Sequence, residues 1–236
     1  MEKDSIGNRM KKYYEDRYRI YLTRRVPVII RVDGRAFHSM DLDKPFDAEF
    51  IAAMRFAAVS TSLEMQGFKM GYIQSDEASF LLTDFDKLET EAWFDYNLSK
   101  LTSISAALMS VYFNRAFHRS VGIFDARAFN VPKEDVPNYF IWRYQDWHRN
   151  SVHMYCQSFF SHKELMNKNS YDQHEMLHSI GKNWATDLSS TEKNGAFIFA
   201  KDVTSSGDLT RSDFGPDYAS ILDKVPILKE GVTWRS

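Results

Sequence analysis

The chain has 236 residues, of which 44% are hydrophobic and 26% are charged, and 30 Lys and Arg against 32 Asp and Glu give a formal net charge of −2. This composition excludes a disordered chain, a collagen-like repeat and a disulfide scaffold, and it excludes a uniformly basic nucleic-acid binder but not a local basic patch. The single cysteine, Cys156, cannot form an internal disulfide, no apolar run is long enough to span a membrane, and residues 1–16 are too charged for a signal peptide. We therefore expect a soluble, cytoplasmic protein.

The first segment, residues 9–25, is strongly basic. It carries seven Lys or Arg residues and two acidic residues, a net +5 in a chain that totals −2, and four tyrosines interleave at helical spacing. One interpretation is a helix that contacts phosphates with aromatic support. The other is an amphipathic helix whose tyrosines pack on the core. The tyrosines are Tyr13, Tyr14, Tyr18 and Tyr21.

The next two elements have clear boundaries. Residues 26–32 form a short β-branched run, which predicts a buried strand that leads into a turn at Asp33-Gly34. Residues 46–66 have apolar positions at helical spacing and are followed by Gly67, a common stop signal for a helix.

The remaining elements continue this alternation. Residues 70–83 predict two strands that flank Ser75-Asp76-Glu77. After them we expect a helix, a strand, a largely helical stretch, shorter helices and a last strand, at 93–118, 121–130, 135–165, 170–188 and 195–201. The order β-α-β-β-α-β is that of a ferredoxin-like antiparallel sheet, the core of polymerase palms and nucleotide cyclases. We predict an α+β fold with packed helices and one palm-like domain over 1–236, with a catalytic core at about 5–135 and a helical C-terminal extension with a returning strand at about 136–236.

Two aspartates lie where predicted strands end. Asp33 follows the first strand and precedes Gly34, and Asp76 lies between two apolar strands and precedes Glu77. If these strands are neighbours, both carboxylates converge at one sheet edge. Oxygen ligands of this kind suit Mg²⁺, and two such ions can clamp the attacking and leaving oxygens of a phosphoryl transfer. The alternative is that both aspartates only serve turns, where Asp is favoured.

Several strings carry a family resemblance. RVDGRAFH at 31–38, DKPFD at 43–47 and YIQSDEASF at 72–80 resemble the signature of the tRNA-His guanylyltransferase family, polymerases that extend RNA in the 3′-to-5′ direction. The resemblance continues in the family's order through LSK at 98–100, FDAR at 124–127 and WHRNS at 147–151. It covers roughly residues 5–200 and implies a palm-like fold, a homotetramer, and tRNA and nucleoside triphosphates as partners, with no membrane.

The resemblance also implies a metal site. The family's ligands for two Mg²⁺ ions fall on Asp33, the backbone carbonyl of Gly34, and Asp76. Glu77 follows the second aspartate as in the family, and we take it as a supporting catalytic acid.

Nucleotide-binding positions are implied in the same way. The positions that contact the triphosphate of GTP, ATP or another NTP match Lys44, Ser75 and Lys100, and compact positive charge and a hydroxyl donor suit polyphosphate. Further nucleotide-binding positions, and those of the later nucleotide or RNA motif, are Arg35, His38, Arg127, His148 and Asn150.

The implied reaction adds nucleotides to a tRNA 5′ end, which is adenylylated with ATP or arrives as a triphosphate before the 3′-hydroxyl of the incoming NTP attacks its α-phosphorus. The sequence departs from the tRNA-His-specific branch at 148–151, where HRNS replaces His-Ile-Asn-Asn, and at Tyr96-Asn97, which replaces a basic pair. We therefore expect template-dependent repair of tRNA 5′ ends. The alternatives are non-templated addition of G to tRNA-His, and a palm module that binds RNA or nucleotide without catalysis.

Three other motifs are incomplete. His174 and His178 fit the zinc-protease pattern H-E-x-x-H, but the third histidine of the extended pattern is Trp184, so we favour a surface helix over a zinc hydrolase. The kinase-like triplet at 213–215 lacks a Gly-rich loop. Cys156, which follows His153 at helical spacing, is interpreted as a buried structural cysteine rather than a nucleophile.

Overall fold

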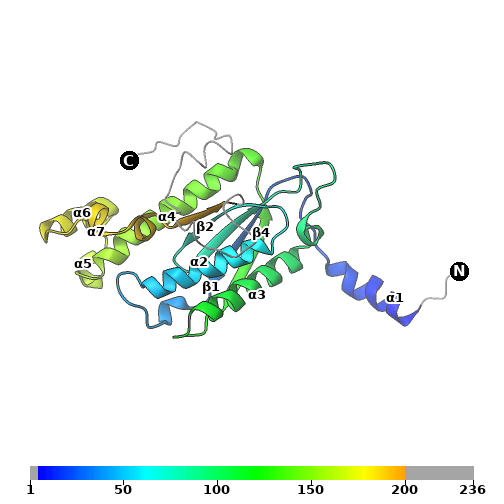
Figure 1. Cartoon of the computed structure of the whole chain (residues 1–236), viewed down its shortest axis with the longest axis horizontal. Helices are drawn as coiled ribbons and strands as arrows, with labels where there is room; N and C mark the ends of the chain where they lie inside the picture. Colours follow the sequence, from blue (N-terminus) through cyan, green and yellow to red (C-terminus); the bar gives the residue numbers. More distant parts are fainter. Residues whose placement is uncertain (1–4, 200–236) are drawn as a thin grey trace.

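The computed structural model describes residues 5–199 and is built around a five-stranded antiparallel sheet (Figure 1). The strand order β4-β1-β3-β2-β5 places the first strand between two later ones. This is the ferredoxin-like arrangement predicted from the sequence, extended by one edge strand. The strands are β1 (Val28–Gly34), β2 (Phe68–Gln74), β3 (Glu77–Leu82), β4 (Phe124–Asn130) and β5 (Ala196–Phe199).

Helices cover both faces of the sheet. The helices α2 (Ala48–Leu63) and α3 (Leu98–Ala116) pack side by side on one face, and α4 (Val136–Cys156) lies on the other (Figure 1). Strand β1 serves both cores because its side chains alternate. Val28, Ile30 and Val32 join the α2–α3 core, whereas Ile29 joins the α4 core.

The C-terminal half of α4 carries a small helical cluster. Its members α5 (His162–Leu165), α6 (Ser170–Ser179), α7 (Trp184–Asp187) and α8 (Ser190–Asn194) follow in sequence. Cys156 is fully buried in the apolar core of this cluster, and burial raises the pKa of its thiol to about 11. The expectation that Cys156 is buried is therefore confirmed.

Two sequence-based expectations for local structure are wrong. Residues 93–118 do not form one helix, because Phe94 and Asp95 adopt positive φ angles of 50° and 53° in a separate 3₁₀ turn, η4 (Trp93–Tyr96). The tyrosines of the basic N-terminal segment do not pack on the core. Its helical part consists of α1 (Ile6–Met10), a π-helical turn η1 (Lys11–Glu15) and a 3₁₀ turn η2 (Asp16–Tyr18), in which every residue is exposed, and Tyr21 is 49% exposed.

Two expectations fall partly or wholly beyond the described part of the chain. The predicted strand at 195–201 is β5 as far as Phe199, and the kinase-like triplet at 213–215 lies outside the described residues. Within residues 5–199, no helix is long and apolar enough to cross a membrane.

Candidate active site

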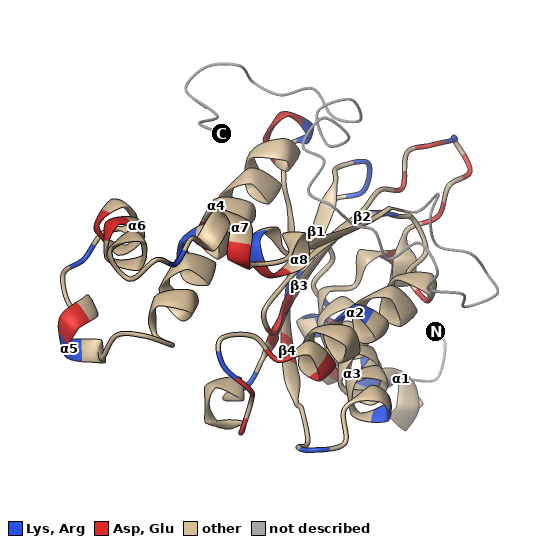
Figure 2. Ribbon diagram, turned by 60° about the vertical axis from the view of Figure 1, so that its left-hand side comes forward, with Lys and Arg blue, Asp and Glu red and all other residues tan. Residues whose placement is uncertain are grey.

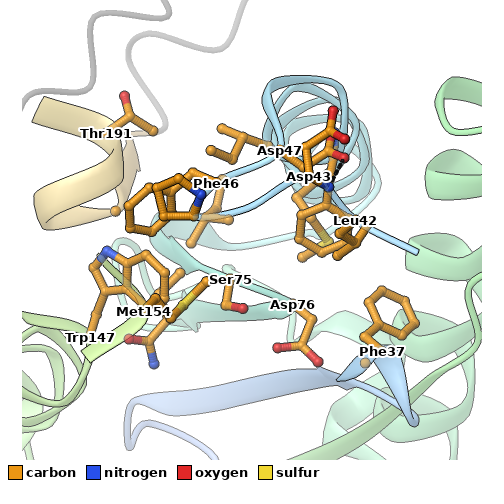
Figure 3. A pocket seen from close by; sticks show the side chains of 18 of the residues that line it. Phe37, Leu42, Asp43, Phe46, Asp47, Ser75, Asp76, Trp147, Met154 and Thr191 are labelled. Carbon is orange, nitrogen blue, oxygen red and sulfur yellow. Dashed lines mark hydrogen bonds between the residues drawn. The ribbon is translucent and has the colours of Figure 1, made fainter. Parts of the chain in front are cut away.

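The end of β1 and the turn between β2 and β3 bring acidic side chains together. In the sheet, Asp33 lies directly between Glu77 of β3 and Asp125 of β4. The amide of Gly34 donates a hydrogen bond of 3.0 Å to the carbonyl of Asp76 in the turn. Figure 2 shows acidic segments gathered at this end of the sheet, and the carboxylate of Asp76 points toward the ribbon of β1 in Figure 3. The predicted convergence of the two aspartates is therefore present.

The carboxyl group of Asp76 has a raised pKa. Burial raises its pKa to about 6, and the nearby charges of Asp33 and Glu77 add to this, while hydrogen bonds from its own backbone and from Ser75 oppose it. The ionised carboxylate is thus held in an unfavourable environment next to a second carboxylate. A divalent cation with oxygen ligands would relieve that repulsion.

Glu77 is engaged on the α4 side of the sheet. Its carboxylate accepts hydrogen bonds from Nε and Nη2 of Arg143, at 2.8 and 3.0 Å, and from Nε2 of Gln74 at 3.1 Å. Both side chains of the Glu77–Arg143 ion pair are at most 10% exposed. Glu77 therefore ties β3 to α4 directly behind Asp76, and the sequence did not reveal Arg143 as its partner.

A pocket of about 420 Å³ opens beside Asp76, a volume within the range of small-molecule sites. Five predicted site residues line it, namely Gly34, His38, Lys44, Ser75 and Asp76. Figure 3 shows its opposite wall, where Phe46, Trp147 and Met154 are apolar. Cationic, hydroxyl and carboxylate groups thus meet a hydrophobic wall in one cavity.

The loop that carries Lys44 is anchored by a residue that the sequence analysis missed. Arg119, which follows α3, forms ion pairs with Asp43, Asp47 and Glu49. Asp47 also caps α2, because its Oδ1 accepts the backbone N–H of Phe50 at 2.9 Å. Lys44 itself is exposed, so the anchored loop presents its ammonium group to solvent at the pocket.

Lys100 lies at the other end of the molecule, contrary to the expectation that it shares a triphosphate site with Lys44 and Ser75. It is in the first turn of α3, with its ammonium group 5.5 Å from the ring of Phe94. The N-terminus of α3 lies near the start of β1 (Figure 1). The 7 residues of β1 span about 20 Å. Within one chain, Lys100 therefore cannot contact a ligand held by Ser75.

Two arginines face each other beside the acidic end of the sheet. Arg127 of β4 is the direct cross-strand partner of Arg31 of β1, and alternation along β1 puts Arg31 on the same face as Asp33. Like charges in this position oppose each other, and the carboxylate of Glu77, 4.0 Å from Nε of Arg31, offsets part of that repulsion. Arg127 was expected to bind nucleotide or RNA. Arg31 was not identified, although its i, i+2 spacing to Asp33 could have revealed it.

The remaining predicted positions do not line the pocket. Arg35 is exposed after β1, and Asn150 is exposed on α4. His148 packs 4.5 Å from the ring of Trp184, and burial, with a further contribution from His174, lowers its pKa. In residues 5–199, no three side chains among His, Cys, Asp and Glu are grouped so as to hold a metal ion, and this includes His174 and His178.

Most of the chain is similar to one group of proteins. Residues 7–132 match the family described as tRNAHis guanylyltransferase. A bacterial tRNA(His) guanylyltransferase-like protein solved in complex with ATP is 40% identical and has a TM-score of 0.80, covering 84% of this chain and 89% of that chain. A structure of such a bacterial protein in complex with GTP is 40% identical, with a TM-score of 0.74 over 83% and 84% of the two chains. The tRNA(His) guanylyltransferase of Debaryomyces hansenii is 28% identical over 209 residues, which are 77% of this chain and 76% of the relative.

Proposed function

The chain belongs to the tRNAHis guanylyltransferase family, and on that premise we propose that it is a Mg²⁺-dependent nucleotidyltransferase that repairs truncated tRNA 5′ ends by templated 3′-to-5′ addition. The observation that carries the proposal is that the backbone places Asp33 and Gly34 beside the turn of Asp76, at the end of the sheet where Gly34, Lys44, Ser75 and Asp76 line one pocket. Solved relatives in complex with ATP and with GTP support nucleoside triphosphates as substrates.

The residues present fit a magnesium site. The carboxylates of Asp33 and Asp76 and the carbonyl of Gly34 are hard oxygen ligands, and the raised pKa of Asp76 reflects a site that favours added positive charge. Bound there, Mg²⁺ would neutralise phosphate charge and lower the pKa of a coordinated hydroxyl. Because no three carboxylate or imidazole side chains are grouped in residues 5–199, the other ligands would be water and substrate phosphates.

The chain's own groups then bind and orient the two reacting ends. Lys44 and Ser75 hold the triphosphate in the pocket, since an ammonium and a hydroxyl both donate to phosphate oxygens. Arg31 and Arg127 hold the phosphate of the RNA 5′ end on the face that carries Asp33. The 3′-hydroxyl of the incoming nucleotide attacks the α-phosphorus of the activated end, and a pyrophosphate or AMP leaving group departs in line. Positioning and charge neutralisation carry this reaction, so no side-chain base is required.

Repair is favoured over the addition of one G because of how the chain uses Tyr96 and Asn97. Tyr96 is fully buried in the α2–α3 core, and Asn97 caps α3 by accepting the amide of Lys100 at 3.1 Å. These residues stabilise the fold and offer no cation to a ligand. The 40% identity to bacterial guanylyltransferase-like proteins, against 28% to the fungal enzyme, agrees with a separate branch.

The test is incorporation of labelled nucleotide at the 5′ end of tRNAs that lack one 5′ nucleotide, with each of the four opposing bases. Repair predicts that the added nucleotide follows the opposing base, whereas addition of G regardless of that base would indicate the non-templated activity. Asp33→Ala and Asp76→Ala should abolish addition. Glu175→Ala, an exposed acid on α6 within the H-E-x-x-H string, should leave it unchanged. Binding of tRNA without any addition would instead indicate a non-catalytic module.

A further inference from the structure

The N-terminal segment from Ser5 to Ile20, here called the basic arm, has no core of its own. No residue in it is buried, and its exposed fractions reach 60% for Tyr14 and 80% for Tyr18. Isolated helices of about 12–15 residues are marginally stable in water. The basic arm therefore has the character of a segment that is stabilised by a partner.

The charges of the basic arm are only partly neutralised. It carries five Lys or Arg and two acids, a net charge of +3 in a chain of −2. Both acids pair with Arg19, which lies 2.7 Å from Glu15 and 3.3 Å from Asp16. No carboxylate within residues 5–199 is in salt-bridge range of the other four cations, which are Arg9, Lys11, Lys12 and Arg17.

Aromatic rings accompany these cations. The ammonium of Lys12 and the guanidinium of Arg17 lie 5.4 and 5.9 Å from the ring centre of Tyr13. Tyr14 and Tyr18 are one helical turn apart and are open to solvent. Lysine, arginine and tyrosine side chains on one exposed helix match the phosphates, sugars and unstacked bases of RNA.

A second copy of the chain fits the basic arm less well. Ile6 and Met10 offer some apolar surface, but burying four unpaired cations against protein would carry a desolvation penalty. Lysine is depleted in the cores of protein interfaces, whereas phosphate groups neutralise lysine directly.

The position of the basic arm defines the size of the ligand. Figure 1 shows α1 beyond the end of the sheet where α3 begins, and the pocket lies at the opposite end. Since β1 alone spans about 20 Å, a mononucleotide in the pocket cannot reach the basic arm. A molecule that touches both must be longer than about 20 Å, as a folded tRNA is.

We propose that the basic arm is a docking surface for the body of the tRNA whose 5′ end enters the pocket. This inference rests on the proposed function, and it assigns to the segment a contact that holds the RNA backbone far from the reacting phosphate. It predicts that the arm contributes to affinity for tRNA and not to affinity for nucleoside triphosphates.

The test compares two full-length variants that lose three positive charges each. One carries Lys11→Gln, Lys12→Gln and Arg17→Gln in the basic arm. The matched control carries Lys163→Gln, Lys168→Gln and Lys182→Gln, three exposed lysines around α5 and α6 at the other end of the molecule. The dissociation constant for tRNA is measured over a range of salt concentrations, together with that for GTP and with the oligomeric state.

The loss of three phosphate contacts should weaken tRNA binding roughly 10-fold. The slope of the logarithm of the binding constant against the logarithm of the salt concentration should decrease in magnitude by about two. The control and the GTP affinity should be unchanged. A second variant, Tyr14→Ala with Tyr18→Ala, should weaken tRNA binding at least roughly 30-fold without changing the slope, because each tyrosine would lose one stacked base.

Two results would overturn the inference while leaving the proposed function intact. In one, the arm variants still add nucleotides, and their tRNA affinity and its salt dependence are the same as those of the wild type. The other is a change of oligomeric state without a change in tRNA slope, which would identify the basic arm as an interface between copies. Failure of the wild-type chain to bind tRNA or add nucleotide would instead refute the proposed function.

Discussion

Gly34 lies where the backbone of β1 closely approaches Asp76 in the candidate active site, so Gly34→Ala is a sensitive test of its geometry. A Cβ at this position would lie 2.8 Å from Cβ of Asp76 and 2.9 Å from Cδ2 and Cγ of Phe37. Non-bonded carbon atoms pack no closer than about 3.5 Å, so the neighbouring atoms must move away by about 0.6 Å. Phe37 cannot retreat easily, because it is 4% exposed and its ring packs against Phe50, Phe113 and Phe124. The displacement therefore falls on the turn that carries Asp76.

This displacement predicts two effects of different size. Overpacking of this kind costs about 1–3 kcal/mol in the free energy of unfolding. Displacing a catalytic carboxylate by a large fraction of an ångström lowers the rate about 100-fold. The turnover number for nucleotide addition and the unfolding free energy in urea would be measured on the same preparations. Gly71→Ala is the matched control, since its Cβ would lie 3.1 Å from the Ser79 carbonyl, within the sheet and away from the acidic edge. Gly71→Ala should keep its activity, and if Gly34→Ala also folded and kept activity within about 3-fold of wild type, the assigned geometry would be wrong.

Four further predictions follow from named contacts. Because burial raises the pKa of Asp76 from 3.8 to about 6, ionising it destabilises the metal-free fold as pH rises through that window. Asp76→Asn in EDTA should gain up to about 3 kcal/mol near pH 8 and almost nothing at about pH 2.5, and the same difference in urea midpoint between variant and wild type at both pH values would refute this. Arg143→Met should cost about 3–5 kcal/mol by leaving Glu77 buried without its partner, and adding Glu77→Gln should recover part of that loss in a double-mutant cycle. Lys44→Ala should raise the KM for GTP roughly 10-fold with no change in urea midpoint, because the side chain is exposed; an unchanged KM would remove it from the triphosphate site. Arg127→Ala should stabilise the fold by a few tenths of a kcal/mol while weakening tRNA binding, and a loss of stability would show that the two facing arginines do not repel.

Local pattern was sufficient to predict the strands. Neither the β-branched run that contains Val28 and Ile30 nor the apolar residues on either side of Asp76 shows apolar positions at helical spacing, so both were predicted as strands. The strand order of the sheet then followed from the order of strands and helices along the chain. The meeting of Asp33 and Asp76 followed in turn, because a ferredoxin-like sheet places their strands side by side.

Partners across the sheet could not be predicted in the same way. Glu77 and Arg143 are 66 positions apart, and only the packing of α4 against β3 brings them together. Lys100 was assigned to the triphosphate site by its motif alone. Motif order gives no information on which end of a helix faces the pocket, and α3 runs with its N-terminus away from it.

Whether the tyrosines of the first segment are buried or exposed also could not be predicted from the sequence. Tyrosines at helical spacing fit a core-facing stripe and an exposed surface equally well, because tyrosine is compatible with both environments. Only the position of α1 beyond the sheet distinguishes them.

The central claim is that Asp33 and Asp76 share magnesium beside the triphosphate of a bound nucleotide. The most direct measurement is a crystal structure of the full chain with Mg²⁺ and a non-hydrolysable GTP analogue. We predict cations bound by both carboxylates and the Gly34 carbonyl, with the phosphates against Lys44 and Ser75. A triphosphate bound elsewhere, or cations that contact neither aspartate, would contradict the account.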